Sequence, residues 1–331
     1  MTKIKLAQFG LGPIGIETIK LAATKPWVQF VGGVDIDPAK QGKTLEQLTG
    51  VASLKPCKVF SSFDALWKEV QPDVVLHTAG SKAQEAVAQI EPIARRGVSV
   101  VSSCEELLFP TLRAPQAAAS LDALCREKGA RVVGTGVNPG FVMDVWPLFM
   151  TGVSRTVDSI YGQRVVNAST RRMPLQKKIG SGLDPEHFRA LFEQGRMGHA
   201  GFQESVSLIA HCLGWKLDKI TETCDPVIAD HEIQTDFFHV PQRMTCGLHQ
   251  HAEGIVEGQA KVVLDLKMYL DARDPHDLVR IAGDPPLEVL VKNGVAGDRA
   301  TVAALVNTVP RIVKAPPGLL LMTDLPVPCW Q

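Results

Sequence analysis

Three glycines near the start of the chain, Gly10, Gly12 and Gly15, have the spacing GxGxxG, with Pro13 and Ile14 inside it. The loop directly follows an alternating apolar pattern typical of a strand and opens a helical pattern, which is the context that gives this motif meaning. The first glycine allows a tight turn, the second lets a pyrophosphate approach the backbone, and the third lets the helix pack on the strand. Free N–H groups at the helix start would bind the phosphate charge. The alternative is a glycine turn without a ligand.

A carboxylate stands where the ribose of a dinucleotide is expected. Asp35 ends the second predicted strand, 20 residues after Gly15, and would accept hydrogen bonds from the adenosine ribose hydroxyls. A carboxylate repels a 2′-phosphate, so Asp35 favours NAD over NADP. Lys40 and Lys43 lie just beyond and soften that preference, so we expect NAD with NADP tolerated.

Further loops follow predicted strands, at the sheet edge where open parallel sheets bind ligands. His77 and Thr78 end the fourth strand and are expected beside the nicotinamide ribose or the pyrophosphate. A half-buried histidine that merely ends a strand is the alternative for His77. Asn138 opens an Asn-Pro-Gly turn, which either contacts the cofactor or is a plain connector.

The pair Glu105 and Glu106 is the best candidate for proton chemistry. It follows the fifth predicted strand and is expected to begin a helix, where the helix dipole favours a carboxylate. The two cannot both face the cofactor. Glu105, closer to the strand end, is our choice, and an ordinary acidic first turn is the alternative.

Strands and helices must alternate to position these residues. Ser81 precedes a helical stretch that Gly97 closes, and Gly129 closes another. Strict alternation predicts right-handed crossovers and a doubly wound parallel sheet of the Rossmann type. The predicted strands are residues 4–9, 30–34, 58–60, 74–77, 98–102 and 131–133.

The pattern changes after about residue 150. Residues 261–270 place Val262, Leu264, Leu266 and Met268 on one face, as in a sheet with one solvated side. The sequence therefore predicts a Rossmann domain over 1–145 and a second, α+β domain over 146–300, built on a largely antiparallel sheet. An amphipathic helix near the end, within 300–331, is expected to pack back on the first domain.

Composition limits the class of protein. The 331 residues include 35 Lys and Arg and 35 Asp and Glu, so the formal net charge is zero and nothing points to nucleic acid. No apolar run approaches a membrane span. The seven scattered cysteines favour a cytoplasmic protein with reduced thiols. Histidine pairs such as His249 and His251 lack the spacing of a catalytic zinc site, so we expect no metal.

Six segments carry a resemblance over nearly the whole chain: "LAQFGLGPIG", "SSCEEL", "GVNPGFVMD", "RRMPLQKKIGSG", "GHAGFQES" and "APPGLLLMTDLP". Together they resemble the 2,4-diaminopentanoate dehydrogenase and native amine dehydrogenase family, relatives of the dihydrodipicolinate reductase superfamily. The resemblance implies NAD(P)-linked oxidative deamination, or in reverse the reductive amination of a small ketone or aldehyde with ammonia. It maps the family glutamate onto Glu105 and implies a homodimer. The paired histidines and substrate loop of dihydrodipicolinate reductase itself are not found.

Four residues are predicted to bind the substrate. The resemblance implies that Phe141 and Trp146 form a pocket wall. Arg172, in a basic loop, is a candidate to pair with a substrate carboxylate, although such a loop is also commonly solvated or bound to cofactor phosphate. His199 lies in a glycine-flanked loop, with a structural role as the alternative. The competing functions are an NAD(P)-dependent reductase of another carbonyl or cyclic imine, and a non-catalytic NAD(H) sensor.

Overall fold

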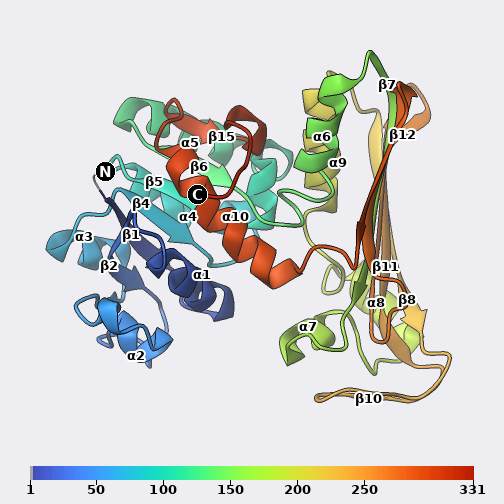
Figure 1. The fold of residues 1–331 in the computed structure, drawn as a ribbon, viewed down its shortest axis with the longest axis horizontal. Helices are drawn as coiled ribbons and strands as arrows, with labels where there is room; N and C mark the ends of the chain where they lie inside the picture. The colour runs from blue at the N-terminus through green and yellow to red at the C-terminus, as the bar shows by residue number, and fades with distance from the viewer. Residues whose placement is uncertain (1–2) are drawn as a thin grey trace. The chain divides into compact units, whose positions relative to one another are not determined.

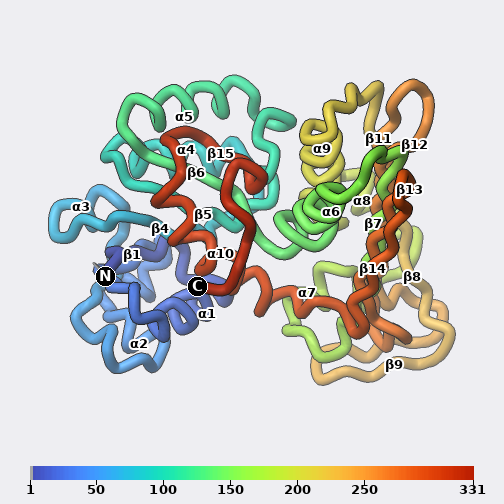
Figure 2. Tube along the Cα trace, turned by 45° about the horizontal axis from the view of Figure 1, so that its top comes forward, coloured from blue at the N-terminus to red at the C-terminus, as the bar shows by residue number. Residues whose placement is uncertain are grey.

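The computed structural model describes residues 3–331, which form two compact units (Figures 1 and 2). Unit 1 contains the chain up to Phe141 together with Ala296–Gln331, and unit 2 is Val142–Val295. The first unit is thus assembled from two separate stretches of sequence.

Unit 1 is built on a seven-stranded sheet in which every neighbouring pair is parallel. The strand order is β15-β6-β5-β4-β1-β2-β3, and the predicted Rossmann-type sheet is confirmed. The seventh strand, β15, was not predicted, because its three residues lie in a short apolar run after two prolines. The strands are β1 (Ile4–Phe9), β2 (Val28–Val34), β3 (Val59–Phe60), β4 (Val74–His77), β5 (Ser99–Ser102), β6 (Arg131–Gly134) and β15 (Gly318–Leu320).

Helices cover the two faces of this sheet. Helices α4 and α5 pack together on one face, and α1 packs with α10 on the other, where α10 also contacts β4, β5 and β6. The helices are α1 (Pro13–Ala23), α2 (Leu45–Thr49), α3 (Phe63–Glu69), α4 (Ala83–Ala94), α5 (Pro115–Lys128) and α10 (Gly297–Ile312). Short 3₁₀ helices are η1 (Ala52–Leu54), η2 (Glu105–Leu108), η3 (Pro110–Leu112) and η5 (Met322–Asp324).

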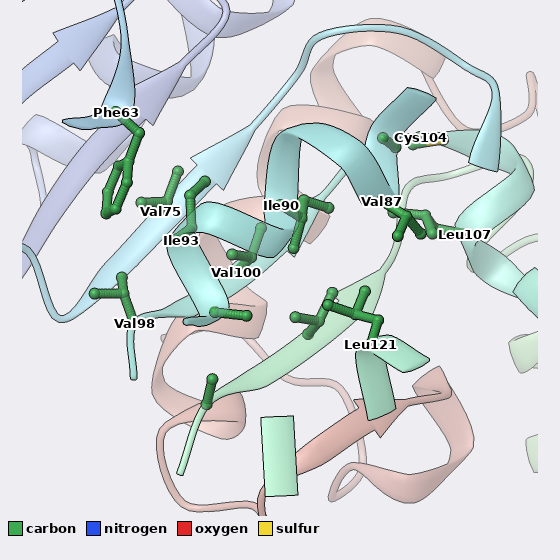
Figure 3. Close-up of a cluster of buried hydrophobic side chains, with 14 of the residues drawn as sticks. Phe63, Val75, Val87, Ile90, Ile93, Val98, Val100, Cys104, Leu107 and Leu121 are labelled. Atoms are coloured by element: carbon green, nitrogen blue, oxygen red, sulfur yellow. The ribbon is translucent and has the colours of Figure 1, made fainter. Parts of the chain in front are cut away.

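A hydrophobic core between α4 and the sheet holds the ends of β4 and β5 in place. Ile90 and Ile93 of α4 are fully buried and pack over Val75 and Val100 of the sheet (Figure 3). The β-branched side chains of Val75 and Val100 suit strands that are buried on both faces of the sheet. Leu107 of η2 belongs to the same cluster, so the segment that follows β5 is anchored in the core.

Unit 2 has a six-stranded sheet of order β14-β13-β7-β12-β11-β8, in which only β7 and β12 pair in parallel. The predicted largely antiparallel sheet is confirmed. Its strands are β7 (Thr156–Asn167), β8 (Lys219–Ile228), β11 (Thr245–Val256), β12 (Gln259–Tyr269), β13 (His276–Asp284) and β14 (Leu287–Lys292), with a small pair β9 (Ile233–Gln234) and β10 (His239–Val240). The helices are α6 (Val145–Met150), η4 (Thr151–Val153), α7 (Met173–Lys178), α8 (Pro185–Glu193) and α9 (Phe202–Cys212).

The two faces of the second sheet differ. Leu264 and Leu266 of β12 are fully buried on the face where α6 and α9 pack, while the opposite face carries no helix among the described residues (Figure 1). Asp265, expected on the solvated face, is only 8% exposed. Its carboxylate is covered by His249 and His251, whose ring nitrogens lie 2.8 and 3.4 Å from Oδ2.

Among residues 3–331, no helix is long and apolar enough to cross a bilayer.

Candidate active site

The glycine loop has a separate steric reason for each glycine. Gly10 has φ +86°, and a Cβ there would lie 2.8 Å from the Thr78 carbonyl oxygen. A Cβ on Gly15 would lie 2.0 Å from the Gly10 carbonyl oxygen, so only glycine lets α1 start this close to β1. A Cβ on Gly12, by contrast, would meet no protein atom within 4 Å. The space over Gly12 is therefore open, beside the start of α1, as a bound pyrophosphate requires.

Thr78 and Gln8 brace this loop from inside. The Thr78 hydroxyl donates to the Gly10 carbonyl oxygen at 2.9 Å and accepts from the Gln8 amide at 3.0 Å. Gln8 is fully buried at the end of β1 and also donates to the Gly10 carbonyl oxygen at 3.2 Å. The loop is thus held in shape by protein groups alone. Pro13 and Ile14 form the first turn of α1.

Asp35 is tied to the same loop. Its carboxylate accepts the Leu11 N–H at 2.7 Å and the Asp37 N–H at 2.9 Å, and Lys40 Nζ lies 3.2 Å from Oδ2. Burial raises the pKa of Asp35, but these two amides and Lys40 outweigh it and hold the pKa below its usual value. Asp35 is therefore an anion beside the glycine loop, with one cation close to it.

The loops that follow the central strands lie side by side. The Thr78 N–H donates to the Phe9 carbonyl, the Ser103 N–H to the His77 carbonyl, and the Thr135 N–H to the Ser102 carbonyl, at 2.8, 2.9 and 2.8 Å. The ends of β1, β4, β5 and β6 consequently form one continuous edge. Glu105 and the Asn-Pro-Gly turn sit on the same edge as the glycine loop.

The two adjacent glutamates have different surroundings. Glu106 is 8% exposed, and its carboxylate accepts the Ala83 N–H at 2.8 Å and Lys82 Nζ at 2.9 Å. Glu106 thus supports the start of α4. The half-buried Glu105 carboxylate has no hydrogen-bond or ion-pair partner among residues 3–331. Of the pair, only Glu105 keeps a carboxylate available to a ligand.

The helix predicted at this pair is only a 3₁₀ helix of four residues. A turn this short has little dipole, so the expected electrostatic advantage at Glu105 is not what distinguishes it. The neighbouring Cys104 is not a competing nucleophile. Burial raises the pKa of its thiol to about 12, and the adjacent carboxylates add to the effect, which keeps the sulfur protonated.

His77 is enclosed within unit 1. It is 0% exposed, with Nδ1 2.9 Å from Ser102 Oγ and Nε2 2.8 Å from Gln89 Oε1. Burial lowers the pKa of His77 to about 4, although the bond to Gln89 opposes the shift. With both ring nitrogens bonded internally, this side chain matches the alternative of a histidine that ends a strand.

The Asn-Pro-Gly segment is a tight turn after β6. Gly140 has φ +122°, and a Cβ there would lie 2.3 Å from the Gly136 nitrogen. Asn138 precedes Pro139 in this turn, and Phe141 is the half-buried last residue of the first segment of unit 1. Asn138 therefore lies at the same sheet edge as Glu105. Its role in cofactor binding stays a prediction.

The other predicted substrate residues belong to unit 2. Trp146 lies in α6, Arg172 directly precedes α7, and His199 lies between α8 and α9. The backbone of His199 is held by the buried Gln250, which accepts its N–H at 2.6 Å and donates to its carbonyl at 2.9 Å. Glu105 and Phe141 are in unit 1, so the predicted substrate contacts are divided between the units.

Sequence reasoning missed the polar residues inside unit 1: Gln8, Gln89 and Ser102. Gln8 bonds to Thr78, and Gln89 bonds to His77. Ser102 bonds to the N–H of Cys104, the neighbour of Glu105. Gln8 gave the only signal, a polar residue close to the end of the first strand and to the glycine loop. Gln89 and Ser102 gave no signal, because glutamine and serine are equally common at the protein surface and in turns.

The chain is similar to known proteins along its full length. The family of the 2,4-diaminopentanoate dehydrogenase C-terminal domain matches residues 141–330. The 2,4-diaminopentanoate dehydrogenase of Acetoanaerobium sticklandii is 30% identical over 99% of this chain and 95% of its own. An amine dehydrogenase of Streptomyces virginiae is 27% identical over 98% of this chain and 96% of its own.

A solved structure shows the same fold. The amine dehydrogenase from Mycobacterium smegmatis matches with a TM-score of 0.85 and 23% identity, covering 100% of this chain and 98% of that one. The family match spans more than half of the chain and the relative at 30% identity spans nearly all of it. The chain belongs to the 2,4-diaminopentanoate dehydrogenase family.

Proposed function

We propose that this protein is an NAD(P)-dependent amine dehydrogenase. It aminates a small ketone or aldehyde reductively with ammonia and, in reverse, deaminates an amine or a diamino acid similar to 2,4-diaminopentanoate. The observation that carries the proposal is the available Glu105 carboxylate on the same sheet edge as the glycine loop. The names of the two relatives support the reaction class.

The cofactor site fits a nicotinamide dinucleotide, with NAD favoured. Gly10, Gly12, Gly15 and the first turn of α1 would hold the pyrophosphate, and Asp35 would bind the ribose. Because Asp35 is ionised, a 2′-phosphate would meet a negative charge. Lys40 reduces this charge because its Nζ pairs with Oδ2 of Asp35. NADH should therefore bind more tightly than NADPH. A titration in which NADPH binds at least tenfold more tightly would contradict this preference.

Glu105 has three tasks in the reaction. As a carboxylate it binds ammonium and takes one proton, which frees ammonia to attack the carbonyl carbon. One proton moves from the attached nitrogen to the former carbonyl oxygen, which gives the carbinolamine. The protonated Glu105 then donates its own proton to the carbinolamine hydroxyl, so that water leaves. The carboxylate that results stabilises the positive iminium. A nicotinamide bound beside Glu105 would supply the hydride for the iminium carbon and, in the reverse direction, would accept it from the amine carbon.

The substrate contacts are proposed residue by residue. The aromatic rings of Phe141 and Trp146 supply apolar contact area for a small aliphatic chain. Arg172 would pair with a carboxylate if the substrate is a diamino acid. His199 has a backbone fixed by Gln250 and would present a polar group. Variants at Arg172 that raise KM only for carboxylate-bearing substrates would support that assignment.

The test compares Glu105→Gln with the wild type. Substitution removes the group that accepts and returns the proton, so we expect kcat for reductive amination to fall at least 100-fold. The Kd of NADH should stay within twofold. Glu127→Gln, at an exposed carboxylate paired with Lys128 on α5, is the control and should keep full activity.

The assay uses small ketones and aldehydes with ammonium and either NADH or NADPH. A Glu105→Gln variant that keeps near-full kcat would refute the proposed role. NADH oxidation that is independent of ammonium would indicate a reductase of another carbonyl. Tight NADH binding without turnover of any carbonyl would indicate a sensor.

We propose further that the protein is a cytoplasmic homodimer. All seven cysteines are free thiols, which suits a reducing compartment. The helix-free face of the second sheet offers a surface for a second copy, related by a two-fold axis as in most homodimers.

A further inference from the structure

A chain of hydrogen bonds within unit 1 leads to the residue before Glu105; it is partly buried at Gln89 and fully buried at His77 and Ser102. It begins at Gln89 on α4, passes through His77 at the end of β4 and Ser102 at the end of β5, and ends on the N–H of Cys104. His77 and Ser102 are each 0% exposed. Cys104 is the residue directly before Glu105, so the last bond holds the backbone one residue before the catalytic candidate.

The donors and acceptors along the chain have one consistent direction. Gln89 Oε1 can only accept, so the proton of the His77 ring lies on Nε2, and Nδ1 is left as an acceptor. The Ser102 hydroxyl then donates to Nδ1 at 2.9 Å. Its oxygen accepts the Cys104 N–H at 3.1 Å. Both ring nitrogens of His77 and the Ser102 hydroxyl are bonded, and connected networks of this kind favour one arrangement of the groups they join.

We infer that His77 and Ser102 are positioning residues for Glu105, which they orient through the backbone of Cys104. This inference rests on the proposed catalytic role of Glu105. Glu106 fixes the other side of Glu105, because its carboxylate is bonded to the start of α4. The residues before and after Glu105 are therefore both tied to buried groups, while its own carboxylate is left available. A catalytic group held in this way is preorganised, and a misplacement of about 1 Å can cost about 100-fold in rate.

The inference predicts an effect on turnover and not on cofactor binding. Ser102→Ala removes both the donor to His77 and the acceptor for the Cys104 N–H. We expect kcat for reductive amination to fall at least tenfold, with the NADH Kd within twofold of the wild type. Ser102→Thr keeps the hydroxyl and should restore most of kcat.

Ser99→Ala is the matched control. Ser99 is a buried serine at the opposite end of the same strand, 4% exposed, so its removal tests the general cost of losing a hydroxyl from β5. The KM of the carbonyl substrate should change less than kcat in Ser102→Ala, because the substrate still binds while Glu105 is misplaced, and Ser99→Ala should change neither constant by more than twofold. Ser102→Cys preserves volume with a weakly bonding thiol and serves as the test if Ser102→Ala does not fold.

Glu105→Gln is measured in parallel to separate the two proposals. If Glu105→Gln is inactive while Ser102→Ala and Ser102→Cys keep kcat within twofold, the positioning role is overturned and the proposed function stands. If a lower melting temperature is the only change, the hydroxyl is merely structural and the inference is again overturned. An active Glu105→Gln would instead remove the proposed function itself.

Discussion

The imidazole of His77 makes the stability of unit 1 depend on pH. Its pKa is about 4 in the folded protein, against an ordinary value of 6.5, because burial disfavours the cation. Between these values the unfolded chain binds more protons at this residue than the folded chain. The contribution of His77 to the free energy of unfolding is therefore fully present above pH 6.5 and is lost as pH falls towards 4.

This predicts a difference between the wild type and His77→Phe. The loss for the wild type is on the order of 3 kcal/mol over the full range. His77→Phe has no titrating ring, so its free energy of unfolding should fall less between pH 7 and pH 5. Urea unfolding at the two pH values measures both changes, and equal changes would contradict the assignment of the shift to His77.

At the scale of residues, the sequence proposes candidates for the chemistry and gives little sign of the residues that hold them. Glu105 was chosen over Glu106 because it is nearer the strand end, and the structure supplies a different reason, the use of the Glu106 carboxylate by Lys82 and Ala83. Ser102 and Gln89 gave no signal, because a hydrogen bond between residues on different elements leaves no local pattern.

At the scale of elements, substitutions in the glycine loop can distinguish effects on protein stability from effects on NADH binding. Gly15→Ala would place a methyl 2.0 Å from the Gly10 carbonyl oxygen, whereas Gly12→Ala would meet no protein atom within 4 Å. We expect Gly15→Ala to lower the melting temperature of the apoprotein by several degrees. Gly12→Ala should leave it unchanged but weaken NADH at least tenfold, because the methyl fills the space the pyrophosphate needs.

Thermal unfolding with and without NADH measures both effects. The wild type should be stabilised by the ligand, and Gly12→Ala should lose most of that stabilisation at the same NADH concentration. A Gly12→Ala variant that binds NADH as tightly as the wild type would place the pyrophosphate elsewhere.

Elements with strong periodicity were predictable, whereas among the short strands of unit 1, β3 was predicted and β15 was not. Strand β1 and helix α5 have clear patterns followed by a glycine. Strand β1 was expected over residues 4–9, as observed, and α5 was expected to end at Gly129, which is its C-cap. Strand β15 and helix η2 contain three and four residues. Pairing with β6 and burial of Leu107 decide these two, and neither is visible as a local period.

At the scale of the whole molecule, the helix-free face of the second sheet predicts the oligomeric state. Val263 of β12 lies on this face, between Tyr161 of β7 and Glu253 of β11. We expect a mass twice that of one chain by light scattering at micromolar concentration. Val263→Asp would bury a charge in a two-fold interface and should shift the mass toward the monomer.

Val327→Asp is the control, because Val327 is 61% exposed and lies in unit 1. It should keep the dimer. A wild type that is monomeric at this concentration, or a Val263→Asp variant that dimerises as before, would count against this face as the contact between copies.

The division of unit 1 between two stretches of sequence has a consequence for biosynthesis. A ribosome finishes β1–β6 first, but the sheet still lacks its outer strand β15, and α1 still lacks α10, until residues 296–331 have emerged. Unit 2 is contiguous and is finished before that moment. The usual order, in which the leading domain of a nascent chain folds first, is therefore reversed. The unit that carries the glycine loop is completed last, and a nascent chain stalled before α10 would present apolar surface to chaperones.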